Sequence, residues 1–262
     1  MSGSPDVSTS LSQLPIRTIC ASSISAMPLD LARGVRTRLT FGPVANINPV
    51  WSPDGKWIAY MSNRGGRFEL LRKQSDGSGA EEVLLTDDSQ LLLTDWSRDG
   101  KFLFYSCVGN TWDGWALPME GERKPSLVVP HGLGAHLSPD GHWLAYSSIE
   151  SGNPEVYVIA FGGGHGKWQV SANKGITPGW SADGKELFYL DPTYNIFAVP
   201  VKDSGGALQF GTPDKLVTNW SAPQVFYDVS PDGKKTLLDR VSQQISQSVT
   251  VVTNFPMELK KN

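Results

Sequence analysis

The chain has 262 residues, of which 39% are hydrophobic and 19% are charged, and its formal net charge is −3. This length is sufficient for one closed all-β domain. The weakly acidic balance provides no basic surface for nucleic acid or for an anionic membrane, so neither is expected as a partner. The 27 glycines and 18 prolines are spread along the chain, as in proteins with many short strands that each need a turn.

The two cysteines, Cys20 and Cys107, are too few for a disulfide framework or a thiolate zinc site, so two unpaired thiols are expected. No apolar run is long enough to cross a membrane. Residues 1–26 lack the basic start and the continuous apolar region of a secretory signal. The sequence therefore predicts a cytoplasmic location for the chain as written, and an extracytoplasmic one if it is a fragment of a membrane-anchored protein.

The N-terminal part is the least regular. Residues 1–11 are expected to be disordered, and residues 12–262 are expected to form a single domain. Within residues 12–34, the segments "IRTICASS" and "SAMPLDL" could each be a strand of a degraded repeat. The stretch "RTRLT" (36–40) is typical of an isolated outer strand.

A turn of the form Ser-x-Asp-Gly then recurs five times, as "SPDG" (52–55), "SRDG" (97–100), "SPDG" (138–141), "SADG" (181–184) and "SPDG" (230–233). Its aspartates lie 45, 41, 43 and 49 residues apart and are Asp54, Asp99, Asp140, Asp183 and Asp232. One apolar strand precedes each turn and further strands follow it. A period in the forties is that of a four-stranded propeller blade.

The residues of this turn have separate structural roles. Proline sets φ at the second position, and each aspartate is expected to accept hydrogen bonds from its own turn. The glycine that follows is expected at positive φ, where any β-carbon is penalised. These glycines are Gly55, Gly100, Gly141, Gly184 and Gly233. The repeated motif therefore predicts turn structure and not active-site chemistry.

The strands after each turn are almost continuously apolar, as in "WIAY" (57–60), which indicates burial on both faces between neighbouring blades. The strand order predicts one outer strand, then four complete blades, then three strands. The stretch 36–40 is therefore expected to complete the last blade. The fold prediction is an all-β propeller of five blades, or of six if residues 12–34 form a degraded one.

The repeats resemble those of TolB-type, WD-repeat-like propellers. The phrases "LDLARGVRTRLTFGPVANINPVWSPDGKWIAYMSNRGG", "HLSPDGHWLAYSSIESGNPEVYVIAF" and "TVVTNFPMELKK", in this order, resemble more closely the C-terminal propeller of acidobacterial-type serine/threonine protein kinases. The resemblance covers about residues 28–262 and implies a six-bladed sensing or binding region. The chain contains no kinase Gly-rich loop, His-Arg-Asp or Asp-Phe-Gly motif, so kinase activity is not implied.

One set of ionisable residues is a candidate ligand site. In a propeller the first strand of each blade lines the central channel, and the side chains along it alternate. Trp51, Trp96, Leu137, Trp180 and Val229 are expected to face neighbouring blades, which leaves the preceding residues to face the channel: Val50, Asp95, His136, Gly179 and Asp228. Asp95, His136 and Asp228 could bind a polar ligand or a cation, or could simply line a solvated channel.

Two loop residues, Trp112 and His131, are further binding candidates, although an aromatic residue here is as compatible with packing. Nucleophile-elbow, zinc-protease, phosphate-loop and calcium-loop patterns are absent from the sequence. The sequence thus predicts a non-catalytic module without cofactor or metal that binds an unknown protein, peptide or small ligand. A lyase or hydrolase centred on Asp95, His136 and Asp228 is the alternative.

Overall fold

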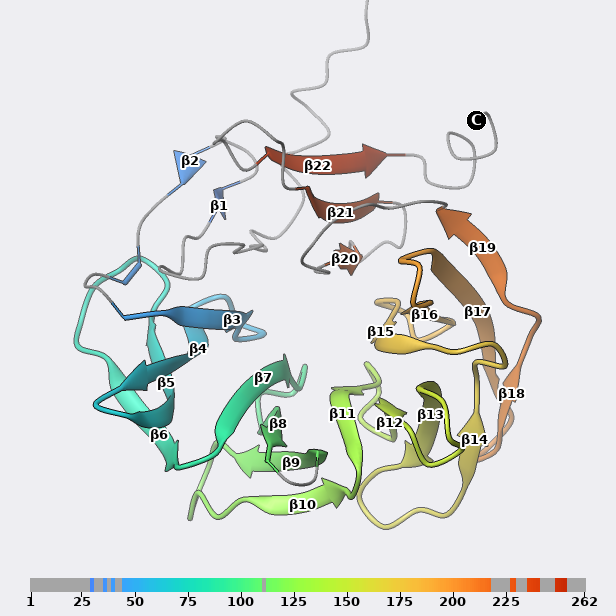
Figure 1. Cartoon of the computed structure of the whole chain (residues 1–262), viewed down its shortest axis with the longest axis horizontal. Coiled ribbons are helices and arrows are strands. Elements are labelled where there is room, and N and C mark those ends of the chain that lie inside the picture. Colours follow the sequence, from blue (N-terminus) through green and yellow to red (C-terminus); the bar gives the residue numbers. More distant parts are fainter. Residues whose placement is uncertain are drawn as a thin grey trace, which may run out of the picture.

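The computed structural model of the chain is all-β, and no helix occurs in the part that it describes (Figure 1). The described residues are 29–30, 35–36, 39–40, 44–109, 112–217, 227–229, 235–240 and 248–253. Within these ranges no helix is long and apolar enough to cross a membrane. Five sheets of consecutive antiparallel strands follow one another around a common centre, which confirms the predicted propeller architecture.

The strands follow the repeat closely. The first sheet contains β3 (Asn46–Trp51), β4 (Trp57–Arg64), β5 (Arg67–Gln74) and β6 (Glu82–Asp87). The second contains β7 (Gln90–Trp96), β8 (Phe102–Val108), β9 (Trp112–Pro118) and β10 (Ser126–Val129). The third contains β11 (Gly132–Leu137), β12 (Trp143–Ser148), β13 (Glu155–Ala160) and β14 (Lys167–Gln169). The last contains β20 (Tyr227–Val229), β21 (Lys235–Arg240) and β22 (Ser248–Thr253).

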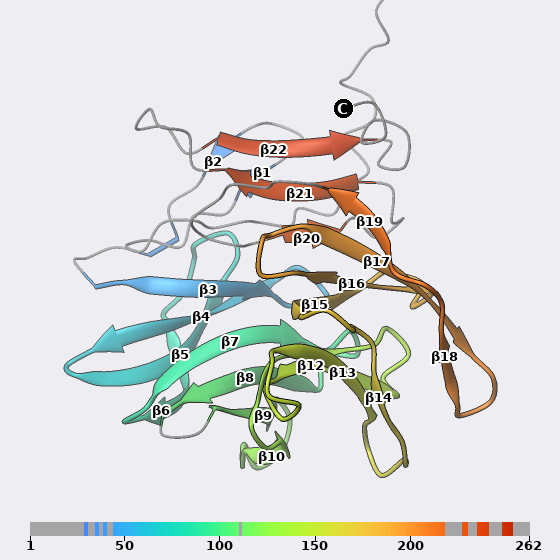
Figure 2. The same cartoon turned by 45° about the vertical axis from the view of Figure 1, so that its right-hand side comes forward.

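The fourth sheet has a divided outer strand. It contains β15 (Ile176–Trp180), β16 (Glu186–Leu190), β17 (Ile196–Asp203), β18 (Leu208–Phe210) and β19 (Asp214–Val217). Both β18 and β19 pair with β17, one after the other along its length (Figure 2). The hairpin formed by β17 and β18 contacts the third sheet near its tip, because the indole N–H of Trp143 donates to Asp203 Oδ2 at 3.2 Å.

The N-terminal strands differ from the expected pairing. β1 (Leu29–Asp30) and β2 (Val35–Arg36) form a two-stranded sheet that lies between the first and last sheets in Figure 1. Arg36 thus pairs with Leu29 and not with β22, and Leu39 belongs to no strand. Leu39 is instead fully buried against the first sheet, next to Ile58. Within the stretch 36–40, Arg36 therefore pairs with β1, and Leu39 packs on the first blade.

Several predictions from the sequence lie outside the described residues. These are the disordered segment 1–11, the strand in "IRTICASS", the thiol of Cys20, and the fifth turn with Asp232 and Gly233.

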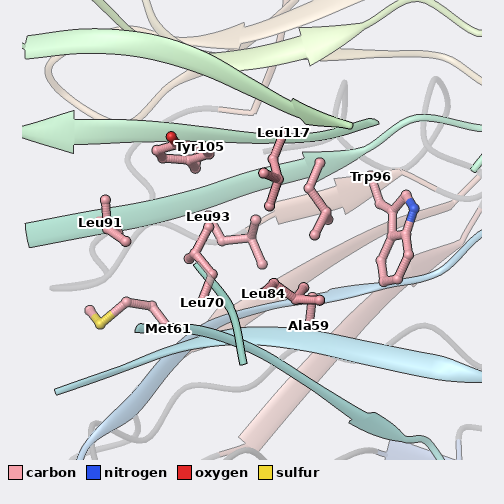
Figure 3. Packing of buried hydrophobic residues seen from close by; sticks show 10 residues of the cluster. Ala59, Met61, Leu70, Leu84, Leu91, Leu93, Trp96, Tyr105 and Leu117 are labelled. Carbon is pink, nitrogen blue, oxygen red and sulfur yellow. The ribbon is translucent and has the colours of Figure 1, made fainter. Parts of the chain in front are cut away.

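Apolar cores fill the spaces between the first four sheets. The core between the first two sheets includes Met61 and Leu70 from one sheet and Leu93, Trp96 and Leu117 from the other (Figure 3). Similar cores join the second sheet to the third and the third to the fourth. The first four sheets are therefore stabilised mainly by apolar contact with one another.

Consecutive residues of β8 show why the strands after the turns are apolar throughout. Leu103 and Tyr105 pack in the core with the first sheet, and Phe104, between them, packs in the core with the third. Alternate side chains of one strand point to opposite faces, and here both faces are covered. The predicted burial on both sides is confirmed.

The same alternation corrects the expected direction of the inner-strand residues. Trp96 is buried toward the preceding sheet, as predicted, but Val50 packs in the core with the following sheet and does not face the centre. Side chains stand perpendicular to their sheet, and the sheets of a propeller face each other. The inner strands β3, β7, β11 and β15 therefore turn their backbone edges to the centre (Figure 1), and their side chains alternate between the two neighbouring sheets.

Candidate functional site

Four of the Ser-x-Asp-Gly turns are each stabilised by the same pattern of hydrogen bonds. In the first, Asp54 Oδ1 accepts the Ser52 hydroxyl at 2.6 Å and the backbone N–H of Lys56 at 3.0 Å. The Ser52 oxygen in turn accepts the N–H of Trp57 at 2.8 Å, and the N–H of Gly55 donates to the Ser52 carbonyl. The pattern repeats around Asp99, Asp140 and Asp183. The glycine φ values are 73°, 77°, 79° and 72°, as predicted.

These bonds also lower the pKa of the aspartates in two of the turns. The Ser52 hydroxyl and then the Lys56 N–H lower the pKa of Asp54 below its usual value. The backbone N–H of Lys185 has the same effect on the pKa of Asp183. Both carboxylates are ionised at neutral pH and bonded to their own turns, which suits structural acceptors and not general acids.

The turn of the second sheet also contacts a distant turn. The Arg98 guanidinium donates to the backbone carbonyl of Ala182 at 2.8 Å. Arg98 lies in the turn of the second sheet and Ala182 in the turn of the fourth, so this bond joins two sheets that are not consecutive.

Asp95, the first of the candidate ligand residues, is bonded between sheets. Its Oδ2 accepts the backbone N–H of Leu137, on the inner strand of the third sheet, at 2.9 Å. The neighbouring Thr94 hydroxyl donates to the Ala135 carbonyl of the same strand at 2.8 Å. Asp95 thus faces the third sheet, and the expectation that its side chain faces the centre is corrected.

His136 contacts the next inner strand through its backbone. Its carbonyl accepts the indole N–H of Trp180, from the next inner strand, at 3.1 Å. Asp228 lies in β20, and its side chain is outside the described part of the structure. In the described ranges no three His, Cys, Asp or Glu side chains gather closely enough to hold a metal ion. Ligand binding by Asp95, His136 and Asp228 stays a prediction.

The thiol of Cys107 lies on β8 and is unpaired, as predicted. Burial raises the pKa of this thiol. A nucleophilic cysteine needs the opposite shift, because the thiolate is the reactive form.

Trp112 and His131 lie on the face opposite the Ser-x-Asp-Gly turns. Trp112 begins β9 and is 48% exposed, and His131 lies in the loop that leads into β11. The N–H of His131 donates to Asp113 Oδ1 at 2.9 Å, and its carbonyl accepts the Ser148 hydroxyl at 2.7 Å. These bonds hold His131 at φ 56° with its side chain exposed, so both predicted loop residues reach the surface at one junction.

The sequence did not single out two further residues of this face. Ile149, next to Ser148, is 69% exposed, the highest value among the large apolar side chains described. Lys174 occupies the loop into β15 that corresponds to the loop of His131, with φ 70°, and its N–H donates to Glu155 Oε1 at 3.1 Å. The signal for Lys174 was the repeat itself, because an acidic residue at the start of the third strand of a blade, Asp113 or Glu155, fixes the next loop. No such signal marked Ile149.

The inner strands contain a bulge at one repeated position. The pairing of β3 with β4, β11 with β12 and β15 with β16 shifts there, and the bulged residues Asn48, Gly134 and Thr177 have positive φ. The N–H of Gly134 donates to Ser106 Oγ, and that of Thr177 to Ser147 Oγ, both at 3.1 Å. Each serine belongs to the preceding sheet, so the bulges also bind neighbouring sheets together.

Comparison with known proteins supports the fold. No family model matches the chain. An uncharacterized protein of Agrobacterium fabrum is 30% identical over 167 residues, which are 62% of this chain and 45% of that protein. The chain therefore spans less than half the length of this relative.

Two solved structures resemble the chain in fold, although their sequence identity to it is lower. TolB from Acinetobacter baumannii has a TM-score of 0.69 at 18% identity, over 87% of this chain and 56% of that one. An oligogalacturonate lyase in complex with manganese has a TM-score of 0.59 at 14% identity, over 91% of this chain and 73% of the lyase. At such identities the likeness concerns fold alone. The chain has a TolB-like β-propeller fold.

Proposed function

We propose that the chain is a non-catalytic binding module that recognises a partner through its loops. One observation carries this proposal: the described carboxylates and the thiol that were candidates for acid–base or nucleophilic chemistry are bonded within the fold or poorly suited to that chemistry. The turn aspartates bind their own turns, Asp95 binds the third sheet, and the pKa of Cys107 is raised. An enzyme site needs convergent groups with shifted pKa values aimed at a substrate.

We infer further that the module is the sensing part of a larger signalling protein. The resemblance to the C-terminal propeller of acidobacterial-type serine/threonine protein kinases supports this inference. In a membrane-anchored kinase such a propeller would be extracytoplasmic. The kinase reaction itself would belong to another part of that protein.

A lyase is the competing function, because one structural neighbour is an oligogalacturonate lyase with manganese. The test is to incubate the chain with oligogalacturonate and manganese and to follow the unsaturated product. We expect no turnover above that of a heat-inactivated sample. Turnover that disappears in a folded Asp95→Asn, His136→Gln double variant would overturn the proposal and assign catalysis to the inner strands.

A further inference from the structure

The hairpin tip between β16 and β17 has a tyrosine at a position that glycine occupies in the comparable turns. Seven turns in the described ranges are closed by a bond from the N–H of the fourth residue to the carbonyl of the first. In the turn of residues 191–194 the fourth residue is Tyr194, with φ 60°. In the other six it is a glycine with φ between 72° and 87°, and these are Gly55, Gly77, Gly100, Gly141, Gly152 and Gly184.

This backbone conformation is unfavourable for tyrosine. Positive φ penalises a residue that has a β-carbon, and the penalty is largest for bulky side chains. Glycine or asparagine would occupy the position at lower energy. Unfavourable conformations persist only where the surrounding structure fixes them, and such residues cluster at functional sites.

Hydrogen bonds to Asp191 fix Tyr194 in this conformation. Asp191 Oδ1 accepts the backbone N–H of Thr193 and that of Asn195, both at 2.9 Å. Its Oδ2 accepts the side-chain amide of Asn195 at 2.6 Å. The N–H of Tyr194 donates to the Asp191 carbonyl, also at 2.9 Å. The carboxylate is thus used inside the loop, which holds the tyrosine in one place.

Packing within the fold does not explain the tyrosine. Its side chain is partly exposed and belongs to none of the apolar cores. Among the described residues the phenol ring has neither a hydrogen-bond partner nor an aromatic partner. By contrast, Tyr189, on the preceding strand, is buried and stacks on Phe197 with 5.2 Å between the ring centroids.

The position of Tyr194 restricts what could bind it. It lies beyond the last paired residues of the hairpin, Leu190 and Ile196, at the end of the sheet opposite the Ser-x-Asp-Gly turns. The neighbouring tip residues Pro192 and Thr193 are exposed and uncharged. A hairpin tip is convex, whereas sites that enclose small molecules are concave. A ligand that encloses this side chain must therefore supply the concave surface, as a folded protein can.

We propose that Tyr194 is the anchor residue through which the chain binds a folded protein partner, and that it enters an apolar pocket with a hydrogen-bond acceptor at its base. The ring provides apolar contact area and the phenol O–H provides the donor. Tyrosine is enriched among the residues that dominate interface energetics. Because the loop is already fixed, little entropy is lost on binding. This inference rests on the proposed binding function and specifies its contact residue and partner class.

The first measurement tests whether the tyrosine is kept at the expense of stability. Asparagine tolerates positive φ, so Tyr194→Asn should raise the melting temperature by about 2–4 °C. Tyr194→Phe retains the unfavourable backbone and should leave the melting temperature unchanged. A melting temperature that falls or stays the same in Tyr194→Asn would show that the side chain stabilises the fold, and would overturn the proposal.

The second measurement tests the anchor itself. The probe is a displayed library of small repeat proteins with a randomised concave surface, selected on the immobilised chain. We expect most independent clones to lose about tenfold or more in affinity for Tyr194→Asn. The loss should be smaller for Tyr194→Phe, because the ring remains and only the donor is removed.

Trp112 provides the matched control. It is 48% exposed and begins β9, the strand of the second sheet that corresponds to β17, and positive φ is not found there. If exposed aromatic surface alone attracted the clones, Trp112→Ser would weaken them at least as often as Tyr194→Asn. We expect most clones to retain their affinity for Trp112→Ser.

The outcomes separate this inference from the proposed function. Clones that keep their affinity for Tyr194→Asn, whether they depend on Trp112 or not, would overturn Tyr194 as the anchor and leave a binding module with another surface. Turnover in the lyase assay would overturn the binding function on which the inference rests.

Discussion

The carboxylate of Asp95 accepts the backbone N–H of Leu137 across the junction between the second and third sheets, at 2.9 Å. Removal of this acceptor leaves a half-buried N–H without a partner. We expect Asp95→Ala to lower the free energy of unfolding by about 1–3 kcal/mol, and Asp95→Asn to lower it less, because its amide oxygen can still accept. Urea unfolding followed by tryptophan fluorescence measures both. Asp88→Ala, at an exposed ion pair, is the control and should be near neutral.

The turn glycines give a second prediction. Gly141 has φ 79°, and a β-carbon there would meet no atom within 4 Å, so backbone strain alone penalises a larger residue. We expect Gly141→Val to destabilise the protein by about 1–3 kcal/mol. Gly141→Asn should cost clearly less, because asparagine tolerates positive φ. A melting temperature equal to that of the unchanged protein in the valine variant would contradict the turn assignment.

The fold could be predicted from the sequence because the residues that specify it form a short local motif that is repeated. Pro-Asp-Gly after a strand specifies a turn, and five copies at a blade period specify a propeller. The candidate site was not accessible in the same way. The direction of Asp95 depends on which sheet faces which, and the exposure of Ile149 depends on how the loop after β12 leaves the sheet. Neither property is encoded in the spacing of residues.

A third prediction concerns the pKa of Asp54 and the stability of the protein at low pH. Ser52 and Lys56 lower the pKa of Asp54, so its bonds contribute stability that is complete above the unfolded pKa, about 3.9. This contribution is lost as the pH falls through the lower folded pKa. We expect Ser52→Ala to raise the pKa of Asp54 toward the unfolded value, as measured by carboxyl NMR titration.

Asp183 in the same variant is the internal control. Its network contains Ser181 and Lys185 and does not include Ser52, so its pKa should be unchanged. An Asp54 pKa equal in both proteins would show that the serine hydroxyl does not stabilise the carboxylate.

The bulges of the inner strands give a fourth prediction. Thr177 is β-branched and has φ 53°, a conformation that the equivalent positions occupy with Asn48 and Gly134. We expect Thr177→Gly to raise the free energy of unfolding by about 1 kcal/mol, because the strain it removes exceeds the added flexibility of the unfolded chain. The reciprocal change, Gly134→Thr, should lower it. Thermal unfolding of both variants checks the pair, and a destabilised Thr177→Gly would disprove strain at this bulge.

The bond from Arg98 to Ala182 affects how the repeats can separate. In a repeat protein whose units contact only adjacent units, stability is a sum along a line, and one unit can open while the others persist. The bond made by Arg98 adds an interaction between two blades that are not adjacent. Because the third blade lies between the second and the fourth in the ring, we expect its opening to displace Arg98 from Ala182, so this bond would couple the opening of the three blades.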